Sequence, residues 1–258
     1  MMGKIIAVAN QKGGVGKTTS TVNLGASLAT LGKKVLLIDI DPQGNATSGV
    51  GVNKGDLNQC VYNILVEDYN VDQVCVTTDI ANLDVIPATI QLAGAEVELV
   101  SATSREGKLK AALADVRESY DFVLIDCPPS LGLLTINALT AADSVLIPVQ
   151  CEYYALEGLS QLLNTIRLVQ KHLNTELMIE GVLLTMLDAR TNLGLQVTEE
   201  VKKYFQEKVY KSIVPRNVRL GEAPSHGKPI TSYDPKSKGA EVYLELAKEV
   251  IAHGERVR

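Results

Sequence analysis

The chain has no tryptophan, only two phenylalanines and only four cysteines among its 258 residues. Cys60, Cys75, Cys127 and Cys151 form no Cys-x-x-Cys pair and no metal-ligand spacing with the three histidines, which argues against a zinc or iron–sulfur site. No apolar run reaches the roughly 18 residues of a membrane-spanning helix. The opening stretch is interrupted at residues 10–12, so it does not resemble a secretory signal. We therefore expect reduced cysteines and a cytoplasmic protein.

What the chain does have is the composition of a globular protein, with 46% hydrophobic and 21% charged residues. Apolar runs alternate with helical stretches, which is typical of a parallel sheet wrapped by helices. Helices are expected at 17–31 (closed by Gly32), 156–172 and 239–253. Strands are expected at 5–9, 35–38, 83–86, 122–125, 145–149 and 179–184, with a shorter one through Ile213 and Val214.

No linker, repeat or low-complexity tract interrupts this alternation. The length suits one large α/β domain or two small ones. We predict a single domain over residues 1–258, built as a predominantly parallel twisted sheet flanked by helices.

Residues 12–19 form a glycine-rich loop between an expected strand and an expected helix. Its glycines let successive backbone N–H groups turn inward around a polyphosphate, and the helix adds the positive end of its dipole. Lys17 is placed to reach the terminal phosphates, and the Thr18 hydroxyl is a natural Mg²⁺ ligand. The loop predicts a nucleotide-phosphate site formed by Lys12, Gly13, Gly14, Val15, Gly16, Lys17, Thr18 and Thr19.

Carboxylates follow two other expected strands. Asp39 and Asp41 come at the end of the strand 35–38, where ligands bind in open α/β sheets, and Pro42 keeps Asp41 out of the helical region. Asp126 ends an apolar strand in the Walker B pattern, so we expect it to hold Mg²⁺ through water. Solvated acids at a strand end, or a cap on the next helix, are the plainer alternatives.

Lys12 is a second cation on a loop that Lys17 already supplies. A solvated charge is the simple interpretation. The alternative is a cation supplied to the transferring phosphoryl group across a subunit interface, as arginine fingers do. With this lysine the loop resembles that of the deviant Walker A ATPases, and within them the ParA/Soj/MinD group. The resemblance covers nearly the whole chain and is close to the Soj subgroup of chromosomal ParA proteins.

The resemblance implies a P-loop NTPase-like fold with ATP and Mg²⁺ as cofactors and weak intrinsic ATPase activity. It implies a homodimer that sandwiches two nucleotides, in which Lys12 contacts the partner's ATP and Asp41 orients the attacking water. Pro215 and Asn217 match a Pro-x-Asn segment that packs on and hydrogen-bonds the adenine. The ATP dimer would bind double-stranded DNA without sequence preference, and a ParB-type protein would stimulate hydrolysis and release it. These properties imply a cytoplasmic, nucleoid-associated protein with no membrane partner.

The charge distribution bears on DNA binding independently. Between Met186 and Lys238 ten Lys and Arg stand against six Asp and Glu, although the whole chain has a net charge of −5. A basic segment on an acidic body is what a phosphate-contacting face looks like, although ordinary solvated helix faces remain the alternative. Guided partly by the family, we predict contacts to DNA from Arg190, Arg219 and Lys236.

Three other functions are alternatives for a chain with this loop. A MinD-like membrane ATPase would end in a basic amphipathic segment, whereas the helix at 239–253 carries three glutamates and packing against the domain is the simpler account. An iron–sulfur reductase would need paired cysteines, which Cys127 lacks. A small-molecule ligase on the same loop has no dedicated motif here.

Overall fold

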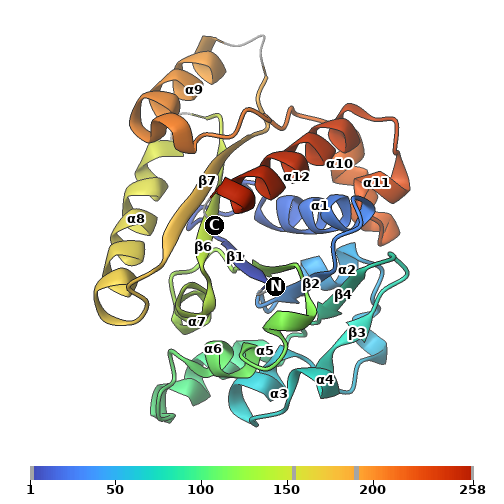
Figure 1. The fold of residues 1–258 in the computed structure, drawn as a ribbon, viewed down its shortest axis with the longest axis vertical. Helices are drawn as coiled ribbons and strands as arrows, with labels where there is room; N and C mark the ends of the chain where they lie inside the picture. The colour runs from blue at the N-terminus through green and yellow to red at the C-terminus, as the bar shows by residue number, and fades with distance from the viewer. Residues whose placement is uncertain (1–2, 153–154, 189–191, 257–258) are drawn as a thin grey trace.

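The computed structural model describes residues 3–152, 155–188 and 192–256, and a seven-stranded sheet runs through it (Figure 1). The strand order is β3-β4-β2-β5-β1-β6-β7, and every neighbouring pair is parallel except β3 with β4. The strands are β1 Lys4–Val8, β2 Val35–Asp39, β3 Val76–Thr77, β4 Leu83–Ile86, β5 Phe122–Asp126, β6 Ser144–Gln150 and β7 Met178–Thr185. The expected fold class is confirmed: a single α/β domain with a mostly parallel sheet flanked by helices.

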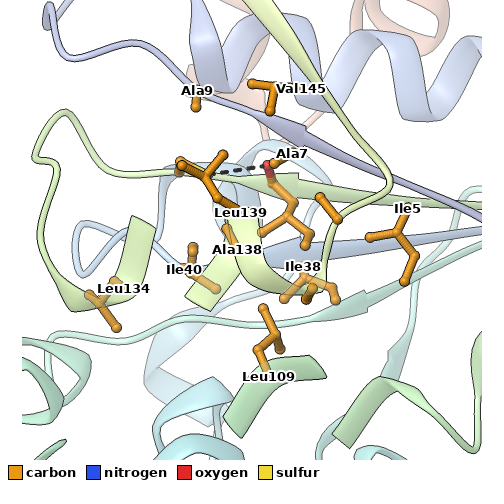
Figure 2. Close-up of a cluster of buried hydrophobic side chains, with 14 of the residues drawn as sticks. Ile5, Ala7, Ala9, Ile38, Ile40, Leu109, Leu134, Ala138, Leu139 and Val145 are labelled. Carbon is orange, nitrogen blue, oxygen red and sulfur yellow. Dashed lines mark hydrogen bonds between the residues drawn. The ribbon is translucent and has the colours of Figure 1, made fainter. Parts of the chain in front are cut away.

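Helices cover both faces of this sheet, because successive residues of a buried strand point to opposite sides. Ile5 and Ala7 pack into one core and Ile6 and Val8 into the other. The first core is closed by α3 Val61–Val66, α4 Val71–Val74, α5 Leu92–Glu98, α6 Lys108–Leu113, α7 Leu133–Ala141, α8 Ala155–His172 and α9 Asn192–Phe205. Figure 2 shows part of this core, where strand residues meet Leu109 of α6 and Leu134, Ala138 and Leu139 of α7.

The second core is smaller and lies under helices from the two ends of the chain. It is closed by α1 Lys17–Thr30, α2 Asn45–Gly49, α10 Val218–Glu222, α11 Ile230–Tyr233 and α12 Lys238–Arg256. In Figure 1 the blue α1 and the red α12 lie side by side. Short 3₁₀ helices lie between these elements, at Lys54–Asp56, Leu99–Ser101, Arg117–Ser119, Gln206–Lys208 and Ala223–His226.

The expected helices form, with ends that differ by a few residues at most. Helix α1 stops before Gly32, whose φ of 80° is the left-handed conformation that ends helices. On α12, the apolar residues Val242, Leu246 and Val250 are buried in the second core, so this helix packs against the sheet as expected. Within the described residues no helix is long and apolar enough to cross a membrane.

The expected strand through Ile213 and Val214 is wrong. The chain there runs beside β7, with hydrogen bonds from Tyr210 N to Val182 O and from Val214 N to Leu184 O. Between them the backbone N–H groups of Lys211 and Ser212 instead donate to the Glu249 carboxylate of α12, at 2.9 and 2.8 Å. The ladder is therefore broken into isolated bridges. Sequence reasoning also missed β3, a two-residue antiparallel edge strand.

Candidate nucleotide site

The predicted phosphate loop joins the end of β1 to the start of α1, at the edge where the parallel strands end. Gly14 and Gly16 have φ values of 73° and 87°, which side chains rarely adopt, so the loop needs glycine at both places. Gly13 and Gly14 are exposed, and a Cβ added at either would meet no atom of the residues that the structure describes within 4 Å. The backbone at these two glycines therefore faces outward and is open to a ligand or a second molecule.

Two side-chain hydrogen bonds hold the loop against strands β6 and β7. Thr185, the last residue of β7, donates from Oγ1 to the Val15 carbonyl at 2.9 Å. The Asn10 amide donates to the Pro148 carbonyl of β6 at 2.7 Å, and its oxygen accepts from the Lys12 N–H at 3.0 Å. The loop is thus fixed to the edge of the sheet at its start and at its middle, which preorganises its N–H groups.

Lys17 is buried at the first position of α1. Its ammonium donates to the Lys12 carbonyl at 3.1 Å. Burial lowers the pKa of Lys17, while the nearby Asp126 and Asp41 carboxylates oppose that shift. A buried cation in the first turn of a helix suits a ligand that carries several negative charges.

Asp126 ends β5 and is fully buried. Its Oδ1 accepts from the Thr21 hydroxyl at 3.0 Å, whereas its Oδ2 is buried with no hydrogen-bond partner among the described residues. Burial raises the pKa of Asp126, and Asp39 raises it further, while the hydroxyls of Thr18 and Thr21 lower it.

These features fit a divalent cation. A buried, unpartnered carboxylate oxygen close to the Thr18 hydroxyl is the donor set that Mg²⁺ takes beside substrate phosphates. The described residues hold no group of three or more His, Cys, Asp or Glu that could bind a metal by itself. Mg²⁺ at this place would therefore take most of its ligands from phosphate and water.

Asp39 and Asp41 have different surroundings. Asp39 accepts from Thr47 N and Thr47 Oγ1, both at 2.8 Å, and from Asp41 N at 3.1 Å. It is fully buried, and burial raises its pKa while the hydrogen bonds from Thr47 and Asp41 lower it. These bonds engage both oxygens of Asp39, so it anchors the loop after β2. Asp41 is the acid of this loop that lies near Lys17, and its Oδ1 accepts from Gln43 N at 2.9 Å.

The segment predicted to hold the adenine lies beside the end of β7. Leu187 and Pro215 form a parallel bridge, in which Leu187 N donates to Val214 O and Arg216 N to Leu187 O, both at 3.2 Å. Asn217 caps α10 by accepting from Arg219 N at 2.8 Å. Thr185, two residues before Leu187, contacts the phosphate loop, so Pro215 and Asn217 belong to the same edge of the sheet as the loop.

Lys12 is engaged within its own subunit. Its side chain is 31% exposed, and its Nζ lies 3.9 Å from Glu152 Oε2. Glu152 also pairs with Arg216, at 3.4 Å between Oε1 and Nη2, and its Oε1 accepts from the Gln150 amide at 2.7 Å. Sequence reasoning did not find Glu152, nor the supporting hydroxyls of Thr185 and Thr47, because nothing in the local sequence marks them.

The predicted DNA-contacting residues lie away from the phosphate loop in sequence. Arg219 of α10 is exposed and pairs with Glu222 at 2.9 Å and with Asp234 at 3.6 Å. Lys236 is exposed two residues beyond Asp234. Arg190 lies outside the described residues. Arg219 therefore contacts an acid that lies two residues before Lys236 in the chain.

Comparison with known proteins identifies the relatives of this chain. A family model described as "AAA domain" matches residues 3–179. The sporulation initiation inhibitor protein Soj of Bacillus subtilis (strain 168) is 76% identical over 253 residues, 98% of this chain and 100% of the relative. ParA of Myxococcus xanthus is 56% identical, over 97% of this chain and 88% of the relative. The chromosome-partitioning ATPase Soj of Treponema pallidum is 55% identical, over 97% and 98%.

Solved structures share the fold over the same length. A cobyrinic acid a,c-diamide synthase from Mycobacterium smegmatis, with bound ADP and magnesium, has a TM-score of 0.88 and 40% identity over 100% of this chain and 97% of that one. The septum site-determining protein MinD of Pyrococcus horikoshii, complexed with Mg-ADP, has a TM-score of 0.81 and 27% identity over 96% of each chain.

Proposed function

We propose that this chain, which belongs to the ParA/Soj family of chromosome-partitioning ATPases, is a switch whose ATP-bound dimer holds DNA. In this proposal residues 1–258 act as one domain. ATP·Mg²⁺ binds each subunit through residues 13–19, two subunits close face to face over the nucleotides, and hydrolysis separates them. A ParB-type protein stimulates that hydrolysis, and the protein works in the cytoplasm on the nucleoid.

The proposal that the chain dimerises rests mainly on the presence of two lysines, Lys12 and Lys17, in one loop that faces outward. Lys17 is buried at the start of α1, where it would bind the phosphates of its own subunit. Lys12 is partly exposed and precedes two exposed glycines, whose Cβ positions meet nothing within 4 Å among the described residues. A second subunit can approach this surface closely, and Lys12 can then neutralise charge on the partner's triphosphate, as an arginine finger does.

The remaining residues position the reactants. The loop N–H groups and Lys17 bind the phosphates, Pro215 and Asn217 hold the adenine, and Asp41 orients the attacking water. Asp126 and Thr18 would hold Mg²⁺, which when bound neutralises developing charge on the phosphate oxygens. Because this catalysis depends on positioning and charge neutralisation, a loosely aligned site hydrolyses ATP slowly. A ParB-type protein accelerates hydrolysis by improving that alignment.

DNA binding follows from dimerisation. Arg219, Lys236 and Arg190 each add a weak cationic contact to phosphate, and two subunits double them. The surplus of positive charge between Met186 and Lys238 supports backbone contacts without base readout. Affinity for duplex DNA then depends on ATP.

The test is sedimentation with plasmid DNA, comparing no nucleotide, ADP and ATP for the wild type and for Asp41→Ala. We expect wild-type protein to pellet with DNA only in ATP, and Asp41→Ala to remain bound because it cannot hydrolyse the nucleotide. Equal pelleting in all three conditions, or a monomeric Asp41→Ala in ATP, would contradict the proposal. A random-sequence duplex as competitor checks that binding ignores sequence.

One comparison favours a second candidate, a small-molecule ligase, because the structure that is 40% identical carries the name of a synthase. A relative 76% identical over the whole chain weighs more heavily for partitioning. A ligase would accelerate ATP hydrolysis with a carboxylic acid and an amine donor and ignore DNA, which an ATPase screen with and without DNA distinguishes. For a MinD-like membrane role, binding to anionic liposomes in ATP is the corresponding test.

A further inference from the structure

Glu152 lies two residues beyond the end of β6, with its carboxylate between two segments of the nucleotide site. Lys12 Nζ is 3.9 Å from its Oε2, on the phosphate side. Arg216 Nη2 is 3.4 Å from its Oε1, on the side predicted to hold the adenine. Glu152 has no role in the proposed ATP hydrolysis, although it contacts Lys12, the cation that the proposed dimer requires.

We propose that Glu152 is a positioning residue, which holds Lys12 within its own subunit and competes with the partner's ATP for that ammonium. The inference rests on the proposed function, in which Lys12 crosses the interface. In this proposal, moving the Lys12 ammonium onto a phosphate of the other subunit takes it away from Glu152, so closure of the dimer breaks the ion pair.

The surroundings of Glu152 keep its carboxylate in place. The Gln150 amide donates to Oε1 at 2.7 Å, and Glu152 N donates to the Gln150 carbonyl at 2.8 Å. Because Gln150 is the last residue of β6, the acid is oriented by the rigid edge of the sheet. Such an acid can select one arrangement of a long lysine side chain, which a freely rotating acid cannot do.

The same geometry makes the contact easy to break. A separation of 3.9 Å exceeds hydrogen-bond length, and the Lys12 and Glu152 side chains are 31% and 47% exposed, so water screens the pair. Arg216 shares the carboxylate, which lets Glu152 keep a cationic partner after Lys12 leaves. A triphosphate carries several charges and outcompetes one shared, solvated carboxylate.

Glu152→Gln tests the competition, because it removes the charge and keeps the size and an oxygen that can accept from Gln150. Freed of the acid, Lys12 is available to the partner, and the dimer in a non-hydrolysable ATP analogue should tighten. One exposed ion pair accounts for a factor of about 1.4–5, and the dimer contains two, so its dissociation constant should fall about 2- to 30-fold. The gain should shrink at high salt.

Glu245→Gln is the matched control. Glu245 is also an exposed carboxylate paired with one lysine, Lys248, at 2.7 Å on α12. Its neutralisation changes the net charge equally and should leave the dissociation constant within about 1.4-fold of wild type.

Two measurements separate the possible failures. Sedimentation velocity with the ATP analogue gives the dimer dissociation constant of the wild type and both variants. Separately, lysines are ¹³C-methylated and the Lys12 signal, assigned with Lys12→Arg, is followed by NMR without nucleotide. We expect Glu152→Gln to shift this signal and Glu245→Gln to leave it in place.

A wild-type dimer that Glu152→Gln does not tighten, or a Lys12 signal that ignores Glu152→Gln, overturns the inference and leaves the proposed function standing. If the wild type and both variants all stay monomeric with the analogue, the proposed function fails and the competition fails with it.

Discussion

Replacing Thr47 by valine tests whether Asp39 anchors the loop after β2. Thr47 is fully buried in α2, and its Oγ1 makes two hydrogen bonds. It donates to Asp39 Oδ2 at 2.8 Å and accepts from Ala88 N at 2.9 Å, which ties the loop to the segment after β4. Valine keeps the shape and the backbone N–H that also bonds Asp39, so the change removes only the hydroxyl.

The expected loss has two parts. A hydrogen bond to a buried carboxylate contributes about 1.5–3 kcal/mol, and leaving the buried Ala88 N–H without a partner costs about 1–3 kcal/mol. Together we expect the free energy of unfolding to fall by about 2.5–6 kcal/mol, which is a large share of the stability of a typical domain, about 5–15 kcal/mol. For a chain of this size, that corresponds to a fall of about 5–24 °C in Tm.

Urea denaturation followed by circular dichroism measures this loss, with Thr30→Val as the control. Thr30 ends α1, is exposed, and its hydroxyl bonds the Ala26 carbonyl of its own helix at 2.8 Å. Its replacement should change the free energy of unfolding by no more than about 0.5 kcal/mol. A loss below about 1 kcal/mol for Thr47→Val would refute the anchoring role.

Three further predictions concern the nucleotide and DNA. Lys17→Ala should weaken binding of a fluorescent ATP analogue about 100-fold or more, because a buried cation among the phosphates is lost, and unchanged affinity would remove the phosphate-loop assignment. Gly13→Val should bind that analogue like the wild type yet stay monomeric in light scattering, since a Cβ there meets none of the described residues within 4 Å, and a dimer would mean a different interface. Arg219→Ala should weaken binding to every duplex alike and reduce the salt slope by about two for a dimer, while Arg167→Ala on α8 leaves both unchanged. Loss on one sequence only would indicate base readout.

Much of this fold could be predicted because its signals are local. The strands 35–38 and 122–125 are uninterrupted apolar runs, and Gly32 marks the end of α1 by its own conformation. Two strands were predicted wrongly. The strand expected near Ile213 is prevented by a distant residue, and β3 has too weak a local signal to be predicted. Glu249 takes the N–H groups that would have extended a strand near Ile213, and β3 is two partly exposed residues at the edge of the sheet.

The candidate site likewise contains residues that the local sequence marks and residues that only the fold brings together. The phosphate loop is contiguous, so its spacing could be recognised, and Asp41 and Asp126 follow apolar strands. Glu152, Thr185 and Thr47 belong to the site only because of the order in which strands assemble. Thr21 is an intermediate case: it follows Thr18 by three residues in a helix, so both lie on one face, and that periodicity could have identified it.

The pairing of β2 with β5 places Asp39 opposite Asp126 in the hydrogen-bonded ladder. The separation of the two carboxyl-bearing residues is therefore set by main-chain geometry, about 4.8 Å between neighbouring strands, and not by any side chain. Point substitutions along these strands can change the charge at this edge without moving its positions. A single-residue deletion within either strand would turn its acid toward the opposite face, so strand length tolerates less variation here than composition does.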